Sequence, residues 1–457
     1  MHGNVEETEL IHHLETADAV VVLHPLVGEE WSLFSSKKRL PQALQIVQPG
    51  AAFIAVNFKR LDLLSGDKLV VRDPNSSRSV TVTPANASDL VQELETSNRS
   101  PHSLLLRTHP LLIKGDGIVV EYFPSIPTLM LPKAPSQLDN PVVVLDSYAY
   151  VTYAAEVDTE STVGTRDEAK EAVCYRKTQP KMYAKARAVA RLMIRTDQEK
   201  AAGSEQVTKW SFCTGWLIGR GNHLVTNHHC VKDAAAVEKS PQNVASRGFQ
   251  FHAVSWFWPR RSERVVEAVV GFMVETKSCR EKGFMGEKVG VVEATRVSVV
   301  VDNPRLDYAL LRVHSNDSLA NLTQRYGYLR LRAAGPVDGE AIYIPQHPRG
   351  EPKEIAAMKD GKLAVIEVQT PSSFESSGYL RRDNEPTVWY NADTEPGSSG
   401  SPVLSRRDNS VVALHRAGNS ETTQSASTEL FNTGVRIDLI ARDLQRRRVL
   451  PPNALSS

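Results

Sequence analysis

The sequence has no long apolar run, almost no net charge and no basic leader at its start. Nowhere in its 457 residues is there an apolar run of the roughly 18 residues that a membrane-spanning helix needs. The formal charge of +1 gives the whole molecule no field that would attract nucleic acid or an anionic membrane surface. Residues 1–30 begin with acidic side chains, and their apolar "AVVVL" is shorter than the core of a signal peptide. We therefore expect neither membrane insertion nor a nucleic-acid partner.

Cysteine is also scarce. The chain has only four, which are Cys174, Cys213, Cys230 and Cys279. This even number permits two disulfides without requiring any. A disulfide would indicate secretion or another oxidising compartment, whereas the missing leader favours the cytoplasm as the alternative.

Short strand-like runs make up most of what is present. Runs such as "GIVVEYF" and "PVVVLDSYAYVTY" are rich in β-branched and aromatic residues, and turn strings such as "LSGD" and "KGDG" separate them. Strands at this spacing, without long helical patterns between them, predict a β-sandwich in the first third of the chain. The pattern loosely resembles CUB-type or jelly-roll accessory modules.

The chain is long enough for two or three domains. A polar, charged stretch that ends at Pro180 indicates an interdomain linker. Near the end, Ile437, Ile440 and Leu444 recur at spacings of three and four, which predicts a short amphipathic helix. The predicted parts are a tail (1–17), a β-sandwich (18–155), a linker (156–182), a second β-rich domain (183–450) and a tail (451–457).

The string "GSSGSP" places Ser399 between two glycines, Gly397 and Gly400. A serine hydroxyl is a poor nucleophile unless a base takes its proton and fixed donors stabilise the oxyanion. Glycines allow a tight turn that brings the N–H groups of Gly397 and Ser399 to one point, as an oxyanion hole. A surface loop rich in Gly and Ser is the simpler interpretation of this string alone.

The string "LVTNHHCV" offers a base. A histidine that ends a strand is held in one orientation if the cysteine after it is tied to the neighbouring strand. Cys213 and Cys230 are 17 residues apart with a strand–turn–strand pattern between them, which suits a bridge across adjacent strands. Two buried free thiols are the alternative.

The string "NPRLDYALLRV" offers a carboxylate. Asp307 opens an otherwise apolar strand, where it would need a donor such as a histidine N–H. A strand-capping aspartate after Pro304 is the simpler interpretation. Asp302 competes for the role, but only Asp307 leads directly into the apolar run.

Together these strings resemble the chymotrypsin-fold serine peptidases, in which base, acid and nucleophile follow in this order. The family's "T-A-A-H-C" string corresponds to residues 226–230 and selects His229 over His228. Its "D-x-A-L-L" string corresponds to Asp307 and the residues after it, and its "G-x-S-G-[SG]-P" string places the nucleophile at Ser399. The resemblance covers roughly residues 183–445. It implies a chymotrypsin-like double β-barrel, a His229–Asp307–Ser399 triad, a protein or peptide substrate and no metal or organic cofactor.

Two departures indicate a branch of this family. Ser398 stands where the trypsin branch has an aspartate that captures a new N-terminus, and no "I-V-G-G" start is present. The string "GSSGSPV", followed by the strand-like "VVALHRAG", resembles the glutamyl endopeptidases instead. In that branch a histidine on this strand and a Ser or Thr five residues before the nucleophile contact the substrate carboxylate. The corresponding residues here are His415 and Thr394.

Asp393 supports the opposite specificity. It lies six residues before Ser399, where trypsin-like enzymes carry the acid that selects Lys or Arg. The motifs favour cleavage after Glu or Asp, with cleavage after Lys or Arg through Asp393 as the alternative. Arg416, beside His415, could add positive charge to the pocket, but the sequence does not give its direction.

Other classes of protein fit less well. A metal site in "LVTNHHCV" would need His228 and His229 to share one ion, yet neighbouring residues of a strand point to opposite faces. His223, His228 and Cys230 could be assembled instead, but no strong zinc spacing is present. A catalytically inactive binding protein would be expected to lack a triad residue, and none is missing. The sequence does not predict the oligomeric state.

Overall fold

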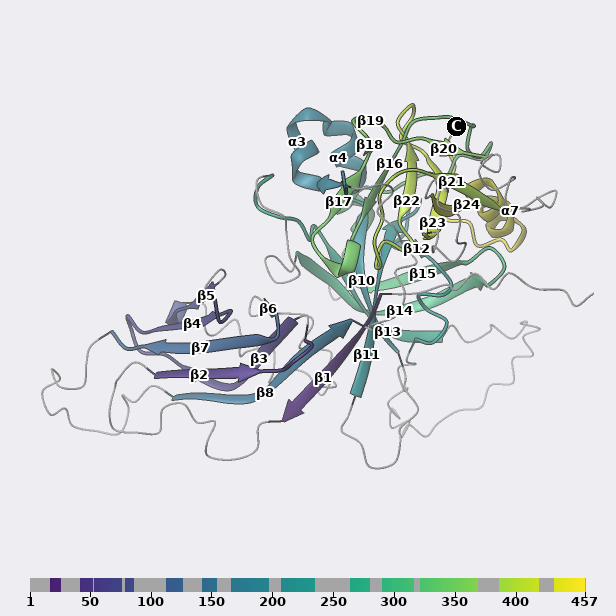
Figure 1. Cartoon of the computed structure of the whole chain (residues 1–457). Helices are drawn as coiled ribbons and strands as arrows, with labels where there is room; N and C mark the ends of the chain where they lie inside the picture. The colour runs from purple at the N-terminus through teal and green to yellow at the C-terminus, as the bar shows by residue number, and fades with distance from the viewer. Residues whose placement is uncertain are drawn as a thin grey trace, which may run out of the picture.

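The computed structural model describes residues 17–25, 42–51, 53–75, 79–85, 112–125, 142–153, 166–196, 207–234, 264–279, 290–315, 321–368, 386–418 and 431–456. These residues form a mostly β structure with two barrels, preceded by a two-sheet sandwich (Figure 1). The predicted fold class is confirmed. Most of the predicted N-terminal tail and the first ten residues of the predicted linker lie outside the described residues.

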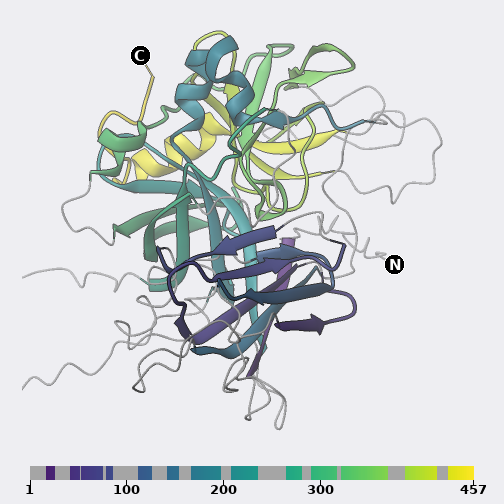
Figure 2. The same ribbon diagram turned by 90° about the vertical axis from the view of Figure 1, so that its left-hand side faces the viewer.

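The N-terminal strands form two packed sheets (Figure 2). One sheet has the order β2-β7-β4-β5, and the strands β1-β8-β3-β6 make up the other. In β7, Ile118, Val120 and Tyr122 alternate toward a core that includes Ile54 and Val56 of β3, as period-2 patterning requires. The strands are β1 (Ala17–Pro25), β2 (Gln42–Val47), β3 (Phe53–Asp62), β4 (Lys68–Arg72), β5 (Ser79–Val82), β6 (Leu112–Lys114), β7 (Gly117–Phe123) and β8 (Val142–Tyr153).

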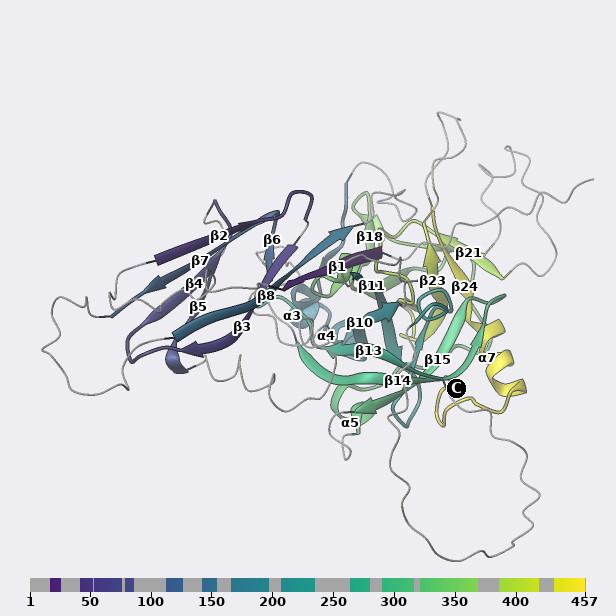
Figure 3. The same ribbon diagram turned by 90° about the horizontal axis from the view of Figure 1, so that it is seen from below.

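The first barrel is a closed ring of six strands. Their order is β10-β13-β14-β15-β12-β11, and the pairing of β10 with β11 closes the ring. The strands are β10 (Val189–Thr196), β11 (Val207–Leu217), β12 (His223–Thr226), β13 (Arg264–Phe272), β14 (Val291–Asn303) and β15 (Tyr308–Ser315). The first half of β11, residues 207–212, also pairs with β1. One sheet therefore continues from the barrel into the sandwich (Figure 3).

The second barrel is an eight-stranded sheet that the pairings of the described residues leave open. Its order is β20-β21-β24-β23-β22-β16-β17-β9. The strands are β9 (Lys170–Glu171), β16 (Ile342–Gln346), β17 (Glu354–Ala356), β20 (Ile366–Glu367), β21 (Thr387–Tyr390), β22 (Pro402–Ser405), β23 (Val411–Ala417) and β24 (Asn432–Arg436). A small hairpin joins β18 (Met358–Lys359) to β19 (Lys362–Leu363).

Short helices cover the barrels. They are η3 (Ala172–Cys174), α3 (Tyr175–Thr178), α4 (Pro180–Ala186), α5 (Leu322–Tyr326), η4 (Pro348–Gly350) and α7 (Ile437–Arg446). The last of these is the amphipathic helix expected near the end of the chain. None of the described helices is long and apolar enough to cross a membrane.

Two segments expected to be connections or tails are built into the second domain. The described part of the predicted linker contains β9, η3, α3 and the start of α4, and β9 pairs with β17. At the other end, the carbonyl of Ala454 accepts a 2.7 Å hydrogen bond from the N–H of Leu331. Both segments also place a few side chains in the core, among them Met182 and Ala454, but these are too scattered to give an apolar pattern in the sequence.

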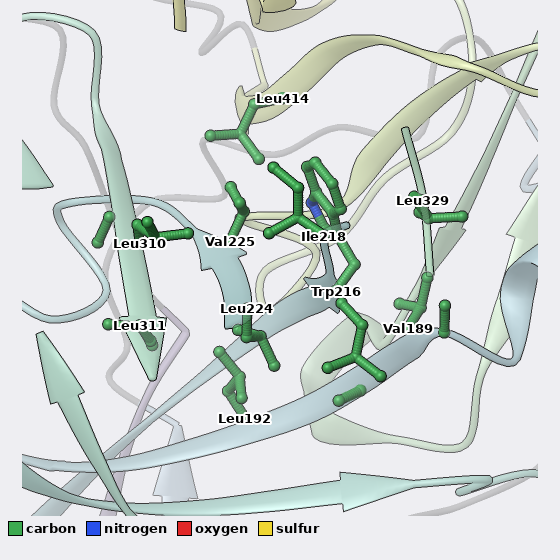
Figure 4. Packing of buried hydrophobic residues seen from close by; sticks show 14 of the residues in the cluster. Val189, Leu192, Trp216, Ile218, Leu224, Val225, Leu310, Leu311, Leu329 and Leu414 are labelled. Atoms are coloured by element: carbon green, nitrogen blue, oxygen red, sulfur yellow. The ribbon is translucent and has the colours of Figure 1, made fainter. Parts of the chain in front are cut away.

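A continuous apolar core joins the two barrels. Side chains from β10, β11, β12 and β15, among them Leu192, Trp216 and Leu310, point into the first barrel (Figure 4). Leu414 of β23 belongs to the same cluster. The strands β12, β15 and β22, next to which His229, Asp307 and Ser399 lie in the sequence, therefore contribute to one shared core.

Candidate active site

His229 lies in a turn just beyond β12, which ends at Thr226. The sequence placed this histidine at the end of the strand, whereas the structure places it after the strand in a turn. Cys230 forms a disulfide with Cys213 of β11, so the turn is covalently tied to the neighbouring strand. His229 is buried with an exposed fraction of 3%.

Asp307 holds His229 through both carboxylate oxygens. Its Oδ2 lies 2.8 Å from Nδ1 of His229, and its Oδ1 accepts a 3.0 Å hydrogen bond from the backbone N–H of His229. The side-chain amide of Asn227 donates to the backbone oxygen of Asp307 at 2.8 Å. Because an ionised carboxylate can only accept, Nδ1 of His229 carries the proton and Nε2 is the free basic nitrogen.

Nε2, the ring nitrogen of His229 that is not bonded to Asp307, is buried. Among the described residues, Nε2 of His229 has no hydrogen-bond partner. A buried ring nitrogen without a partner costs free energy, and such an atom fits a group that exchanges a proton during a reaction.

Ser399 lies in the loop between β21 and β22, and this loop is docked on β11. The N–H of Thr214 donates to the carbonyl of Ser399 at 2.9 Å, and its hydroxyl donates to the carbonyl of Gly397 at 3.0 Å. A Cβ on Gly400, whose φ is +88°, would lie 2.2 Å from the carbonyl oxygen of Thr214. Only glycine allows this approach, so the glycine of the motif has a structural reason.

The Ser399 hydroxyl donates to the carbonyl of Arg416 at 3.3 Å rather than to His229. In structures without substrate, catalytic hydrogen bonds are often long and tighten only in the complex. The predicted oxyanion donors, the N–H groups of Gly397 and Ser399, flank Ser398, whose own N–H donates to the carbonyl of Glu395 at 2.9 Å. Gly397 has a φ of +99°, and no hydrogen bond among the described residues uses its N–H.

Arg416 lies beside Asp307, a position that the sequence did not predict. Its Nε lies 3.7 Å from Oδ2 of Asp307, and no hydrogen bond in the described part of the chain uses that nitrogen. Burial raises the pKa of Asp307, but the neighbouring His229 and Arg416 outweigh burial and hold that pKa below its usual range. Arg416 thus supports the ionised form of Asp307.

Thr394 and His415 are both buried at the base of the Ser399 loop. His415 lies on β23, and its Nδ1 is 2.5 Å from the hydroxyl of Tyr390 on β21. That hydroxyl donates to the carbonyl of Thr433 at 2.8 Å, so the imidazole of His415 donates through Nδ1. The hydroxyl of Thr394 is buried and has no partner among the described residues.

The carboxylate of Asp393 is hydrogen-bonded to Glu168, which lies two residues before β9. Its Oδ2 accepts a 2.8 Å hydrogen bond from the backbone N–H of Glu168, and its backbone oxygen accepts from Gln346 at 3.1 Å. The sequence gave no sign of the contact with Glu168, because the two residues are 225 positions apart.

Both possible disulfides are present, since Cys174 pairs with Cys279 and Cys213 with Cys230. The sequence left the first pairing open. Cys230 is consequently not available as a thiolate ligand, and no cluster of three or more His, Cys, Asp or Glu in the described residues could hold a metal ion.

A family model described as a trypsin-like peptidase domain matches residues 213–414, a stretch that includes His229, Asp307 and Ser399. Together with the double barrel, this match supports a trypsin-like peptidase domain with the chymotrypsin fold.

Curated proteins that are similar to the chain include the following two. The secreted RxLR effector protein 73 of Plasmopara viticola is 33% identical over 313 residues, which is 68% of this chain and 62% of that protein. The uncharacterized protein y4fB of Sinorhizobium fredii (strain NBRC 101917 / NGR234) is 29% identical over 187 residues, 34% of this chain and 26% of that protein. The chain therefore spans less than two thirds of the length of either relative.

Solved structures give more distant matches. The HtrA-type protease AlgW with tripeptide has a TM-score of 0.33 at 15% identity, covering 58% of this chain and 61% of that one. The Rv3671c protease in its inactive form has a TM-score of 0.31 at 16% identity, covering 62% and 98%.

Proposed function

We propose that the protein is a serine endopeptidase that cleaves peptide bonds through His229, Asp307 and Ser399. The observation that supports this best is the double hydrogen bond from His229 to Asp307, which leaves a buried, basic Nε2. The Ser399 loop is docked on β11, the strand whose Cys213 is bonded to the residue after His229. One strand thus positions both the base and the nucleophile.

The proposed reaction is acyl transfer. Nε2 of His229 takes the proton of the Ser399 hydroxyl, which attacks the peptide carbonyl carbon, and the N–H groups of Gly397 and Ser399 stabilise the oxyanion. His229 then protonates the leaving amine. Water, activated by the same nitrogen, hydrolyses the acyl-enzyme and regenerates Ser399. Asp307 stabilises the imidazolium that forms in both steps.

We further propose a preference for cleavage after Glu or Asp. The buried hydroxyl of Thr394 can donate to a carboxylate. Because Nδ1 of His415 already donates to Tyr390, His415 would bind a carboxylate through Nε2–H in its doubly protonated form. The N–H of Glu168 binds one carboxylate oxygen of Asp393. The alternative preference for Lys or Arg would need an aspartate carboxylate facing the substrate. The two disulfides and the word "secreted" in the name of the Plasmopara viticola relative support an oxidising compartment.

The experiment that tests the activity compares Ser399→Ala with Ser401→Ala. A fluorophosphonate probe should label the wild type and Ser401→Ala but not Ser399→Ala, and peptide cleavage should follow the same pattern. Ser401 is a matched control because it is a buried serine of the same loop. Labelling that persists in Ser399→Ala would disprove the assignment of the nucleophile.

A mixed peptide library tests the specificity. Cuts should fall after Glu and Asp, and Thr394→Val should lower kcat/KM for these peptides about tenfold, since it removes one hydrogen bond to a charged group. Cuts mainly after Lys or Arg would contradict the acidic preference while leaving the activity itself established.

A further inference from the structure

Residues 166–171, which we call the strap, join the N-terminal module to the barrels and are fixed to the second barrel. Lys170 and Glu171 form β9 and pair with Ile355 and Glu354 of β17. The N–H of Ala172 then donates to the carbonyl of Lys353 at 2.8 Å. Just beyond the strap, the disulfide from Cys174 to Cys279 anchors the chain covalently. The strap therefore enters the barrel at a fixed register.

Glu168 of the strap makes two contacts with the barrel. Its backbone N–H donates to Oδ2 of Asp393 at 2.8 Å, and its Oε1 accepts from the N–H of Gly361 at 3.2 Å. Asp393 is 1% exposed, so the hydrogen bond replaces water that its carboxylate would otherwise need. The backbone oxygen of Asp393 is held separately by Gln346.

The direction of the Asp393 carboxylate matters because of its place in the loop. Thr394, the next residue, has a buried hydroxyl without a partner in the described part of the chain, and His415 is held by Tyr390 on the neighbouring strand. A carboxylate turned toward these two groups would compete with an acidic substrate side chain and repel it. The N–H of Glu168 binds Oδ2, one of the two carboxylate oxygens of Asp393.

We propose that the strap is a specificity-determining element, which holds the Asp393 carboxylate out of the substrate pocket and leaves Thr394 and His415 to bind an acidic side chain. This inference rests on the proposed peptidase function. It makes Glu168 a positioning residue that acts on the pocket through Asp393. It also gives the segment between the two modules a role in substrate selection.

The test removes only the backbone N–H of Glu168, which donates to Asp393. Glu168→Pro deletes the backbone N–H, while Glu168→Ala keeps it and removes the contact to Gly361. The readout is the ratio of kcat/KM for two peptides that differ only in Glu or Lys at the cleaved position. We expect Glu168→Pro to lower this Glu-to-Lys ratio at least about tenfold, and Glu168→Ala to leave it within about twofold of the wild type.

A double variant identifies the cause. In Glu168→Pro combined with Asp393→Asn, the released side chain has no charge, so the ratio should return to within about threefold of the wild type. If it stays low, the effect of the proline is a general distortion and the inference is wrong. An unchanged ratio in Glu168→Pro would also overturn it.

Labelling with the fluorophosphonate shows whether each protein is active, and its melting temperature shows whether it is folded. If Glu168→Pro does not fold, Asp393→Asn alone decides, because a carboxylate outside the pocket should change the ratio by no more than about twofold. A rise of the ratio beyond about twofold would place the carboxylate inside the pocket and overturn the inference. A wild type that neither labels nor cleaves would instead contradict the proposed function.

Discussion

The Nδ1 atom of His228 lies 2.9 Å from Oδ2 of Asp302, while the adjacent His229 faces Asp307. The two neighbouring histidines thus have different carboxylate partners. His228 and Asp302 are partly exposed, whereas His229 and Asp307 are buried. A partly exposed pair contributes little to stability, and no hydrogen bond among the described residues joins these two side chains to the Ser399 loop.

Replacing the two histidines separately should give very different results. His229→Ala removes the proposed base and should lower kcat/KM on the order of 10⁴-fold or more. His228→Ala removes only the partly exposed pair and should stay within about threefold of the wild type. Steady-state kinetics on one peptide substrate measures both. Equal losses in the two variants would contradict the assignment of the base.

The parts of the site that sequence predicts are those with a local signal. Asp307 precedes a run of apolar residues that becomes β15, whereas Asp302 lies near the end of β14. The strand–turn–strand pattern favoured a bridge from Cys213 to Cys230, and the structure forms it between β11 and the turn after β12.

Arg416 and Glu168 could not be predicted in the same way. The contact of Arg416 with Asp307 depends on how β23 of the second barrel lies against the first, and no local pattern gives that arrangement. The contact of Glu168 with Asp393 uses a backbone N–H, which every residue except proline possesses. The residue type therefore holds no information about it.

The disulfide from Cys213 to Cys230 should support both stability and catalysis. It closes a loop of 17 residues, for which chain entropy predicts about 3 kcal/mol of stabilisation. Cys213→Ala combined with Cys230→Ala should lower the free energy of unfolding by about that amount and also lower kcat, because the turn that holds His229 loses its covalent tie. Urea unfolding and kinetics well below the melting temperature measure the two effects.

The second disulfide provides the control for this comparison. Cys174→Ala combined with Cys279→Ala should also destabilise the protein, since the bridge spans 105 residues. It should leave kcat near the wild-type value on the peptide with Glu, because the pairing of β9 with β17 still fixes the strap and no hydrogen bond among the described residues joins either cysteine to His229, Asp307 or Ser399. An equal loss of kcat in both double variants would show that the effect is general destabilisation.

Asp443 of α7 connects the terminal helix to the strand that begins beside Asp307. Its Oδ2 accepts hydrogen bonds from the hydroxyl of Tyr308 at 2.7 Å and from the side-chain amide of Asn303 at 2.9 Å, and Arg446 and Arg447 also contact the carboxylate. Burial raises the pKa of Asp443, but the bonds from Tyr308, Asn303 and Arg446 outweigh it and lower that pKa from 3.8 to about 2. The folded protein therefore favours the ionised form.

A pKa lowered by folding gives a stabilisation that is complete above the unfolded value and is lost as the pH falls through the folded value. The shift of the Asp443 pKa corresponds to about 2 kcal/mol at neutral pH. Asp443→Asn should therefore lower the free energy of unfolding by about 2 kcal/mol at pH 7, and the difference from the wild type should shrink between about pH 4 and pH 2. Urea titrations across this range measure it. Asp233→Asn is the control, because the side chain of Asp233 is 69% exposed and should change stability by less than about 0.5 kcal/mol at any pH. A difference for Asp443→Asn that is constant with pH would show that the helix depends on the shape of this side chain rather than on its charge.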